Sequence, residues 1–277
     1  RDLNERLFRT KNPYGKPKKR RSDWAEGLNV PDIQADPHDI LFFVGSEQSY
    51  NPRDQETARA LVDIFRNIKI DFGTLGNVEA DAGEYALSTG EEALFEELAE
   101  LNIKSIQKAK FKAVVTVSPH DYHVMKNDYP KLGGDFNVLH FTEFLNEMIQ
   151  DNKLKFGQNF NKKVVYHDPC FLGRYNKIFD GPRKVLKAIP GLNLVEMNKI
   201  REDSECCGGG GGGAFIDIPA GERISERRVA QALETGAEIL AVACPFCMAM
   251  FEDAVKALRC EDKIEVKNIA EIVRDAL

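Results

Sequence analysis

Cysteine is absent from the first 169 residues of this 277-residue chain, and all six cysteines lie beyond that point. A disulfide-stapled secreted domain is small and evenly cross-linked, so this distribution excludes that class. No apolar run reaches the roughly 18 residues of a membrane span, and a formal net charge of -6 disfavours nucleic-acid binding. No signal-peptide pattern is seen either, so we expect a cytoplasmic protein, or one held on the inner face of the membrane by a partner.

The sequence begins at Arg1 rather than at methionine, as expected for a processed chain or for the C-terminal part of a longer one. Residues 1–38 predict an extended lead-in or linker, with a turn at "NPYGKP" and at most a short helix in "KKRRSDWAEGL". The one basic run, Lys16 to Arg21, indicates a solvated tail, with docking to an acidic partner or a membrane surface as the alternative. Trp24 is expected to anchor this segment by packing.

Apolar runs of strand length alternate with helical patterns from residue 39 onward. Residues 39–45 ("DILFFVG") and 113–118 ("AVVTVS") predict buried strands, whereas 53–68 and 89–109 have helical spacing. Strands that alternate with helices predict a parallel sheet with helices on both faces. We therefore expect an α/β fold with aromatic side chains in its core, namely Phe42, Phe43, Phe65 and Phe95.

The pattern of the first part of the chain returns in the second part. Residues 162–170 ("KKVVYHDPC") match residues 38–46 ("HDILFFVGS"), and the matching positions along the chain lie 124 to 126 residues apart. Such regular spacing indicates an internal repeat. We expect two pseudo-symmetric Rossmann-like halves, each a mainly parallel sheet flanked by helices, at residues 39–155 and 156–277.

Five of the six cysteines form one pattern, C-x35-CC-x36-C-x2-C. In an open α/β sheet, binding sites form where the carboxyl ends of the strands meet. Each cysteine segment follows a predicted strand or the loop after one, so three distant segments can deliver five thiols to one place. The C-x2-C pair starts a predicted helix, whose N-terminal amides and dipole favour thiolate over thiol. The five are Cys170, Cys206, Cys207, Cys244 and Cys247, and Cys260 lies outside the pattern as an ordinary cysteine.

Clustered thiols of this kind indicate a metal centre, and two kinds of centre stay open. Five thiolates exceed the four ligands of a zinc ion, whereas an iron–sulfur cluster holds several irons and can share a bridging thiolate. Six glycines follow the adjacent cysteines, and bare backbone there allows amides to donate to the sulfides of a cluster. Gly208, Gly209 and Gly210 are therefore the predicted cofactor-binding glycines. A structural zinc site is the rival interpretation.

The motif resembles a known family, the CCG cysteine-rich domain. The shared features are "HDPC", the Cys-Cys-Gly segment with its glycine run, and "CPFC". This domain is found in iron–sulfur oxidoreductases of the heterodisulfide-reductase type, in their B-type proteins and in the C-terminal part of their D-type proteins. The resemblance spans residues 39–277, and the lead-in is similar to the segment that follows the paired ferredoxin motifs of the D-type proteins.

The resemblance implies noncubane 4Fe-4S clusters and electron transfer to or from a disulfide or thiol, a sulfur carrier, a quinone or a flavoprotein. It also implies partner subunits, which would carry ferredoxin-type iron–sulfur clusters, a flavin or a quinone site in the membrane. The first half of this chain departs from the family pattern, because serine, aspartate and alanine do not replace thiolates around iron and sulfur. We therefore expect one noncubane cluster per chain, held by the second half. The positions of the first half that match its cysteines, called the vacated positions here, are Ser46, Asp81, Ala82, Ser118 and Asp121.

Other polar residues near these positions have two interpretations each. His167 is predicted to move a proton to a substrate sulfur, or else to cap a loop through a hydrogen bond. Arg174 is predicted to neutralise the cluster or an anionic substrate, or else to make a plain surface salt bridge. His120 and His123 are expected to pack in a loop rather than to bind a metal.

The predicted function is that of an iron–sulfur electron-transfer subunit, or a fragment of one, in a heterodisulfide-reductase-like oxidoreductase complex. The alternative is a redox-inert docking module that carries a zinc site. The intact set of five cysteines favours the first, whereas the loss of thiols from the first half gives weight to the second. Visible absorption distinguishes them, because an iron–sulfur protein is brown and a zinc protein is colourless.

Overall fold

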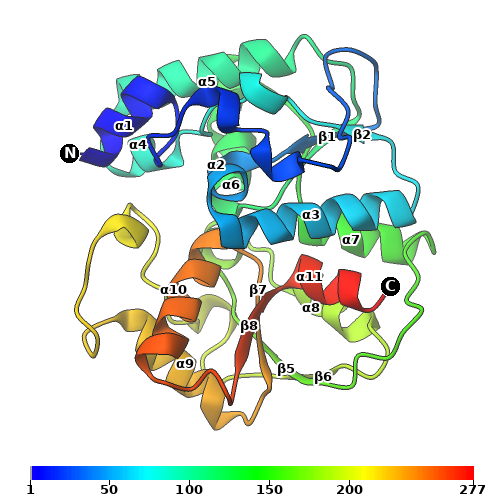
Figure 1. Cartoon of the computed structure of the whole chain (residues 1–277), viewed down its shortest axis with the longest axis vertical. Helices are drawn as coiled ribbons and strands as arrows, with labels where there is room; N and C mark the ends of the chain where they lie inside the picture. The colour runs from blue at the N-terminus through cyan, green and yellow to red at the C-terminus, as the bar shows by residue number, and fades with distance from the viewer. Residues whose placement is uncertain (1) are drawn as a thin grey trace. The chain divides into compact units, whose positions relative to one another are not determined.

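The computed structural model describes residues 2–277 of the chain, which divides into two compact units. Unit 1 comprises residues 1–141 and unit 2 comprises residues 142–277. Each unit is a four-stranded parallel sheet with helices packed against it (Figure 1). No helix among residues 2–277 combines the length and the apolar character that a membrane crossing requires.

The sheet of unit 1 has the strand order β2-β1-β3-β4, with every neighbouring pair parallel. Its strands are β1 (Ile40–Phe43), β2 (Phe72–Gly73), β3 (Ala113–Thr116) and β4 (Val138–His140). Its helices are α1 (Asp2–Thr10), α2 (Gly45–Tyr50), α3 (Pro52–Asn67), α4 (Glu84–Ser88), α5 (Glu92–Ile106) and α6 (Pro119–Asn127). All residues of the central strands β1 and β3 are buried, as expected where helices cover both faces of a parallel sheet.

The sheet of unit 2 repeats the same connectivity, with the order β6-β5-β7-β8 and every pair parallel. Its strands are β5 (Lys163–Tyr166), β6 (Asn193–Val195), β7 (Ile239–Val242) and β8 (Glu265–Asn268). The helices are α7 (Phe141–Gln150), α8 (Asp180–Ala188), α9 (Ile224–Glu234), α10 (Pro245–Ala257) and α11 (Ile269–Asp275). The predicted fold of two similar α/β halves is confirmed.

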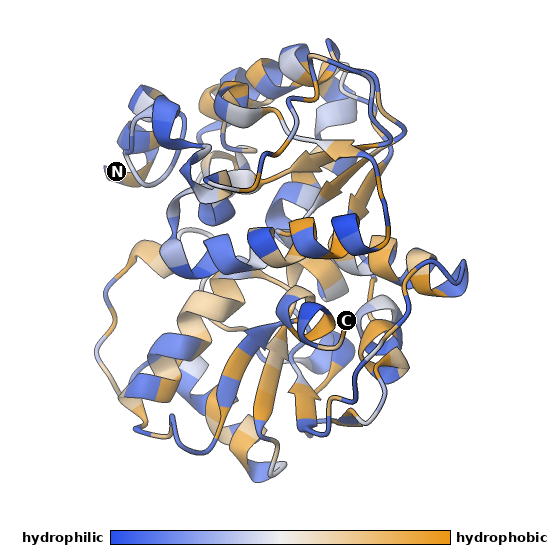
Figure 2. Ribbon diagram, turned by 45° about the vertical axis from the view of Figure 1, so that its right-hand side comes forward, coloured by the Kyte–Doolittle hydropathy of each residue, from blue (hydrophilic) through white to orange (hydrophobic). Residues whose placement is uncertain are grey.

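Apolar side chains concentrate on the strands, which Figure 2 colours largely orange in both sheets. The aromatic residues predicted for the core, Phe42, Phe43, Phe65 and Phe95, are at most 6% exposed. The rings of Phe42 and Phe65 meet edge to face with centroids 5.7 Å apart. Burial of such large apolar side chains is the main source of folding free energy in each unit.

The N-terminal segment packs more closely than its sequence indicates. Leu7 of α1 is fully buried, and Trp24 packs edge to face on Phe42 with ring centroids 5.9 Å apart, as predicted. The prediction of a solvated basic run is wrong at Arg21, whose side chain is 2% exposed and ion-pairs with Glu79 at 2.7 Å. A charge run cannot show that a buried carboxylate lies 58 residues further along the chain.

A candidate metal centre in unit 2

Three segments of unit 2 carry the five clustered cysteines, and each segment lies beyond the carboxyl end of a strand. Cys170 follows β5, the adjacent pair lies in the loop between β6 and α9, and Cys244 is the N-cap of α10 after β7. Strand β5 lies between β6 and β7 in the sheet, so the three strand ends are neighbours. The sheet therefore collects the thiols at one edge, where α/β proteins build their sites.

The five sulfur atoms form one continuous group. The Sγ atoms of Cys207 and Cys247 lie 3.4 Å apart. Cys206 hydrogen-bonds to Cys170 on one side and to Cys207 on the other, and Cys247 hydrogen-bonds to Cys244. All are free thiols, and the group is asymmetric: Cys170 and Cys206 are half-buried whereas the other three are at most 3% exposed.

The sixth cysteine stands apart, as the sequence predicts. The thiol of Cys260 is buried and donates to the carbonyl oxygen of Val255 at 3.5 Å. Burial raises the pKa of Cys260, with a further contribution from Glu261, and none of the clustered cysteines contributes to that shift. Cys260 is therefore a small core residue rather than a member of the cluster.

Hydrogen bonds among the clustered thiols lower the pKa of Cys206 and raise the pKa of its neighbours Cys170 and Cys207. The contact with Cys170 lowers the pKa of Cys206 to about 2, and contacts with Cys207 and the amide of Gly208 act in the same direction. The same contact raises the pKa of Cys170, a contact with Cys206 raises that of Cys207, and burial raises the pKa of Cys247. Because a bound metal favours thiolate at every ligand, this group of thiols would release protons on loading.

Two backbone amides of the glycine run point at sulfur. The amide of Gly208 donates to Sγ of Cys206 at 3.3 Å, and that of Gly209 donates to Sγ of Cys207 at 3.5 Å. Gly208 has φ +87°, the left-handed region that favours glycine, and a Cβ added at Gly209 would lie 3.0 Å from Cβ of Phe246. The absence of a side chain at Gly208 and Gly209 thus lets their amides come close to the sulfur atoms.

Gly210 and Arg174, two further predicted site residues, act on the loop rather than on sulfur. The carbonyl of Gly210 accepts from the amide of Gly213 at 3.0 Å, which shapes the turn. The guanidinium of Arg174 donates to the carbonyl oxygens of Glu202 and Ser204, just ahead of the adjacent cysteines. Among residues 2–277 no ion pair of Arg174 is found, so the surface salt bridge considered for it is absent.

His167 lies inside the centre. Its side chain is 1% exposed, it packs edge to face on Phe251 at 4.7 Å, and a ring nitrogen lies within 4.8 Å of Sγ of both Cys207 and Cys247. Its Nδ1 accepts a hydrogen bond from Nε of Arg228 at 3.3 Å. Burial lowers the pKa of His167 well below its usual range, and the Arg228 cation lowers it further, so the ring is neutral near pH 7.

The residue after His167 fixes the backbone at this strand end. Asp168 accepts two hydrogen bonds from Arg183 of α8, at 2.6 and 2.8 Å, and a third from the amide of Arg201 at 2.7 Å. A bidentate arginine–carboxylate pair of this kind is geometrically specific and, when buried, strongly coupled. Sequence reasoning missed this pair because nothing in the pattern of α8 distinguishes Arg183 from a surface arginine.

The vacated positions of unit 1 also come together. Asp81 hydrogen-bonds to Ser46, and the amide of Asp121 donates to Oγ of Ser118 at 3.3 Å. Oδ2 of Asp121 lies so close to Gly45 that a Cβ there would be 2.4 Å away. The pseudo-symmetry predicted from the repeat is thus seen in the arrangement of side chains as well as in the order of strands.

The histidines beside this group lie on a helix, so their predicted placement in a loop is wrong. Both belong to α6, which starts because Ser118 caps it and Pro119 occupies its first turn. His120 is buried and pairs with Glu84 at 2.8 Å, while His123 contacts the side chain of Asn127 at 3.2 Å. The contact with Glu84 occupies Nδ1 of His120.

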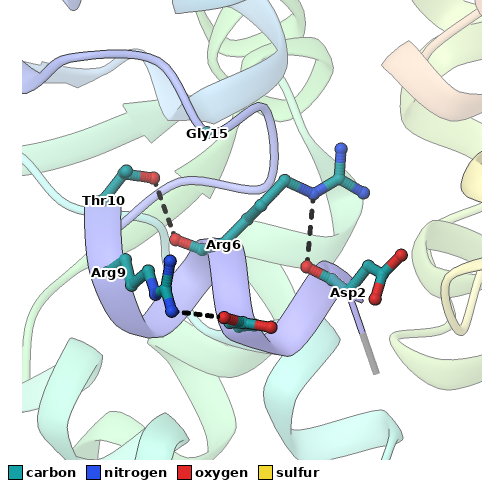
Figure 3. A pocket seen from close by; sticks show the side chains of 6 residues that line it. Asp2, Arg6, Arg9, Thr10 and Gly15 are labelled. Carbon is teal, nitrogen blue, oxygen red and sulfur yellow. Dashed lines mark hydrogen bonds and ion pairs between the residues drawn. The ribbon is translucent and has the colours of Figure 1, made fainter.

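A surface hollow of about 530 Å³ lies beside α1, away from these two groups (Figure 3). Two of its charged side chains form an ion pair, Arg9 with Glu5 at 2.6 Å, and they are 72% and 53% exposed. Arg6 donates to the backbone carbonyl oxygen of Asp2 at 3.3 Å. An exposed pair of this kind contributes little free energy, so the hollow shows no built site. The hollow is lined by Asp2, Glu5, Arg6, Arg9, Thr10 and Gly15.

Comparison with known proteins identifies the repeat and the cysteine motif. The CCG cysteine-rich domain matches residues 40–126 and 164–252, once in each unit and over more than half of the chain. The matched ranges start 124 residues apart and end 126 residues apart, in agreement with the internal repeat.

Curated relatives are similar over nearly the whole chain. The "Probable iron-sulfur-binding oxidoreductase FadF" of Bacillus subtilis is 36% identical over 98% of this chain and 40% of its own length. The "EtfAB:quinone oxidoreductase" of Syntrophomonas wolfei is 34% identical over 98% of this chain and 40% of its own. The D-type protein of a heterodisulfide reductase from Methanosarcina barkeri is 37% identical, with coverages of 96% and 65%.

The chain thus spans two fifths of the length of the first two relatives and less than two thirds of the third. The family match falls on both sheets and on the cysteine segments described above. The chain belongs to the family of the CCG cysteine-rich domain.

Proposed function

We propose that unit 2 holds one noncubane 4Fe-4S cluster, and that the chain is the electron-transferring part of a heterodisulfide-reductase-like iron–sulfur oxidoreductase. The observation that carries the proposal is the continuous group of five thiols. Cys206 and Cys207 are adjacent in sequence but contact different neighbours, Cys170 and Cys247. Such a set exceeds the four ligands of zinc and suits a centre in which the adjacent sulfurs serve different irons or bridge two.

The residues around the thiols fit such a centre. When bound, the cluster supplies a one-electron redox centre at this edge of the sheet. The amides of Gly208 and Gly209 donate to ligand sulfur and so stabilise added negative charge. Arg174 holds the loop that presents the adjacent cysteines, and its cation lies close enough to His167 to lower the pKa of that ring.

The half-buried sulfur atoms mark the side of the site at which electrons would pass to or from a partner. Cys170 and Cys206 are the more exposed pair, so a thiol, a disulfide or a redox protein would approach on their side. His167 lies behind this edge, beside the buried sulfurs, where its predicted transfer of a proton to a substrate sulfur would take place. The other three cysteines are shielded and would act as fixed ligands.

The names of the relatives indicate the class of partner. One is called an EtfAB:quinone oxidoreductase, and another is named as part of a heterodisulfide reductase. By analogy, we assign this chain a redox partner that carries a ferredoxin-type iron–sulfur centre, a flavin or a membrane quinone site. The protein would then work in the cytoplasm, or at the inner face of the membrane through that partner.

A zinc-bearing docking module is the second candidate, and one observation favours it. Ligand atoms of His167, Cys207 and Cys247 lie within 4.8 Å of one another, as a tetrahedral zinc site would require. The hydrogen bond from Arg228 to His167 weighs against it, because it occupies one ring nitrogen and leaves the other protonated.

Metal analysis of anaerobically purified protein tests the proposal. We expect about four irons and four sulfides per chain, a brown colour and an EPR signal that changes in Cys206→Ser and in Cys207→Ser, both of which should abolish turnover while the fold persists. Cys260→Ser is the matched control and should leave iron content and signal unchanged. One zinc per chain in colourless protein would make the proposal wrong. Full activity and an ordinary cubane signal in both serine variants would show a simple electron relay instead.

A further inference from the structure

Arg228 is a buried cation without a carboxylate partner. It lies in the middle of α9 and is fully buried. Its guanidinium donates to Nδ1 of His167 at 3.3 Å, to Oε1 of Gln231 at 2.6 Å and to Oγ of Ser204 at 3.2 Å. None of these partners is anionic, and among residues 2–277 no ion pair of Arg228 is found.

The other two buried arginines of the described chain differ in this respect. Arg21 pairs with Glu79 at 2.7 Å, and Arg183 pairs with Asp168 at 2.6 Å. A buried charge is costly unless an opposite charge compensates it. The carboxylates that act on Arg228 from a distance, Asp168 and Glu205, are paired with other cations. The structure therefore predicts that a further negative charge belongs close to Arg228, and the sulfur group beside His167 can supply one, since Cys247 also acts on the Arg228 charge.

The hydrogen bond from Arg228 determines the proton position on His167. A guanidinium has only N–H donors, so Nδ1 must accept and the ring proton resides on Nε2. Nε2 is buried and has no hydrogen-bond partner within the described chain. The ring lies beside the sulfur group, with one of its nitrogens within 4.8 Å of Sγ of Cys207 and Cys247. Nε2–H is the one donor of the ring that is left for this group.

Arg228 also ties two cysteine segments together. Ser204, two residues before Cys206, accepts from Arg228 and donates its own hydroxyl to the carbonyl of Asp168, two residues before Cys170. Arg228 is therefore linked to the segments that precede both half-buried cysteines, directly at Ser204 and through Ser204 at Asp168. These hydrogen bonds hold the two segments in position.

We infer that Arg228 is a positioning residue for the metal centre, which keeps His167 as an Nε2–H donor to sulfur rather than a metal ligand and raises the reduction potential through its buried charge. The inference rests on the proposed iron–sulfur centre. Reduction adds one negative charge to such a centre, and a nearby cation and an N–H donor stabilise the reduced form more than the oxidised form. Low dielectric in the buried site enlarges both effects.

A redox titration of the full chain, followed by EPR, tests the charge effect. We compare Arg228→Met with Arg227→Met, which removes the same charge from the preceding residue of α9, where the side chain is 66% exposed and paired with Glu205. At the wild-type midpoint potential, Arg228→Met should lower the ratio of reduced to oxidised centre about tenfold, a shift of about 59 mV for one electron. Arg227→Met should change it less than about twofold, because solvent screens that charge.

Two further variants keep the test decisive if Arg228→Met fails to fold. Arg228→Lys retains the charge and should retain most of the wild-type potential, whereas His167→Phe removes the N–H donor and should lower it. Pulsed EPR should detect a weakly coupled exchangeable proton near the wild-type centre, absent in His167→Phe, and no directly bonded histidine nitrogen.

Three results would overturn the inference. One is a wild-type potential in Arg228→Met with full iron content, and another is a directly coordinated nitrogen in wild-type protein. The third result applies if Arg228→Met does not fold: it is a wild-type reduction potential in His167→Phe. Wild-type protein without iron and sulfide would instead overturn the proposed function, and this inference with it, so the two failures are distinguishable.

Discussion

Arg21 and Glu79 show how unit 1 holds a buried charge. Glu79 accepts from Arg21 at 2.7 Å and from the amides of Val44 and Gly45 at 3.0 and 2.9 Å. Arg21 also donates to the carbonyl oxygen of Ala80 at 3.2 Å. Each group is thus compensated by the other and by backbone, so loss of either leaves an unpaired charge in the interior.

Removal of the cation should be strongly destabilising. We expect Arg21→Met to lower the free energy of unfolding by about 3–5 kcal/mol, because it leaves the Glu79 carboxylate buried without its partner. Urea unfolding followed by Trp24 fluorescence measures the effect. Lys19→Met, in the same basic run but exposed, should change it by less than about 0.5 kcal/mol. Equal effects of the two substitutions would contradict the expectation, and adding Glu79→Gln to Arg21→Met should recover part of the loss.

The cysteines were predictable from sequence, whereas the buried arginines were not. Five thiols with strand-end spacing carry a chemical signal that few other functions produce. Arg228 lies in an amphipathic helix and Arg21 in a basic run, and both patterns are typical of solvated surface. Their burial depends on partners 58 and 61 residues away in sequence, which no local pattern reveals.

At the scale of elements, buried carboxyl groups gather where the strands of unit 1 end. Glu47 of α2, Asp121 of α6 and Asp81 before α4 are each at most 6% exposed. Burial raises the pKa of all three, and Asp121 raises that of Glu47 further. Glu84 is the exception, since burial is outweighed by His120 and other partners, which together lower its pKa.

These shifts predict opposite dependences of stability on pH. Where the folded pKa is raised, the folded state binds more protons than the unfolded state, so stability falls as pH rises above the ordinary carboxyl range. Glu47→Gln and Asp121→Asn should therefore raise the urea midpoint at pH 8, and the gain should vanish toward pH 4. Glu84→Gln, the matched control, should lower the midpoint at pH 8 and matter less at acid pH. If the rise in urea midpoint were the same at every pH, the ionisation of Glu47 and Asp121 would not be the cause of the pH dependence.

Element boundaries were predicted well where local chemistry marks them. The helix expected at 53–68 is Pro52–Asn67, capped by the side chain of Asn51 with proline in the first turn. The helix expected at 89–109 is shorter, because Gly90 has φ +83° and separates α4 from α5. The placement of His120 in a loop failed because Ser118 and Pro119 are a helix start.

At the scale of the whole molecule, two units with the same topology have different side chains at the carboxyl ends of their strands. Both units have the same strand order, yet unit 2 has five thiols where unit 1 has two aspartates, two serines and an alanine at the equivalent positions. The repeat was visible in sequence because its spacing is regular, and each unit has its own core. Because each unit has its own core, we expect each to unfold in a transition of its own.

Metal removal should therefore affect the stability of one unit more than the other. The single tryptophan, Trp24, lies in unit 1 and reports on its unfolding, whereas the proposed cluster and its visible absorption lie in unit 2. Ligand that binds only the folded state stabilises it, so loaded unit 2 should resist denaturant. After anaerobic chelation, we expect the Trp24 transition to stay at the same urea concentration while far-UV circular dichroism gains an earlier transition from unit 2. Cys244→Ser, which removes a buried ligand, should reproduce the chelated profile, and Cys260→Ser should not. If chelation moved the Trp24 transition by as much as that of unit 2, the two units would unfold as one cooperative body, and the assignment of metal-dependent stability to unit 2 alone would be wrong.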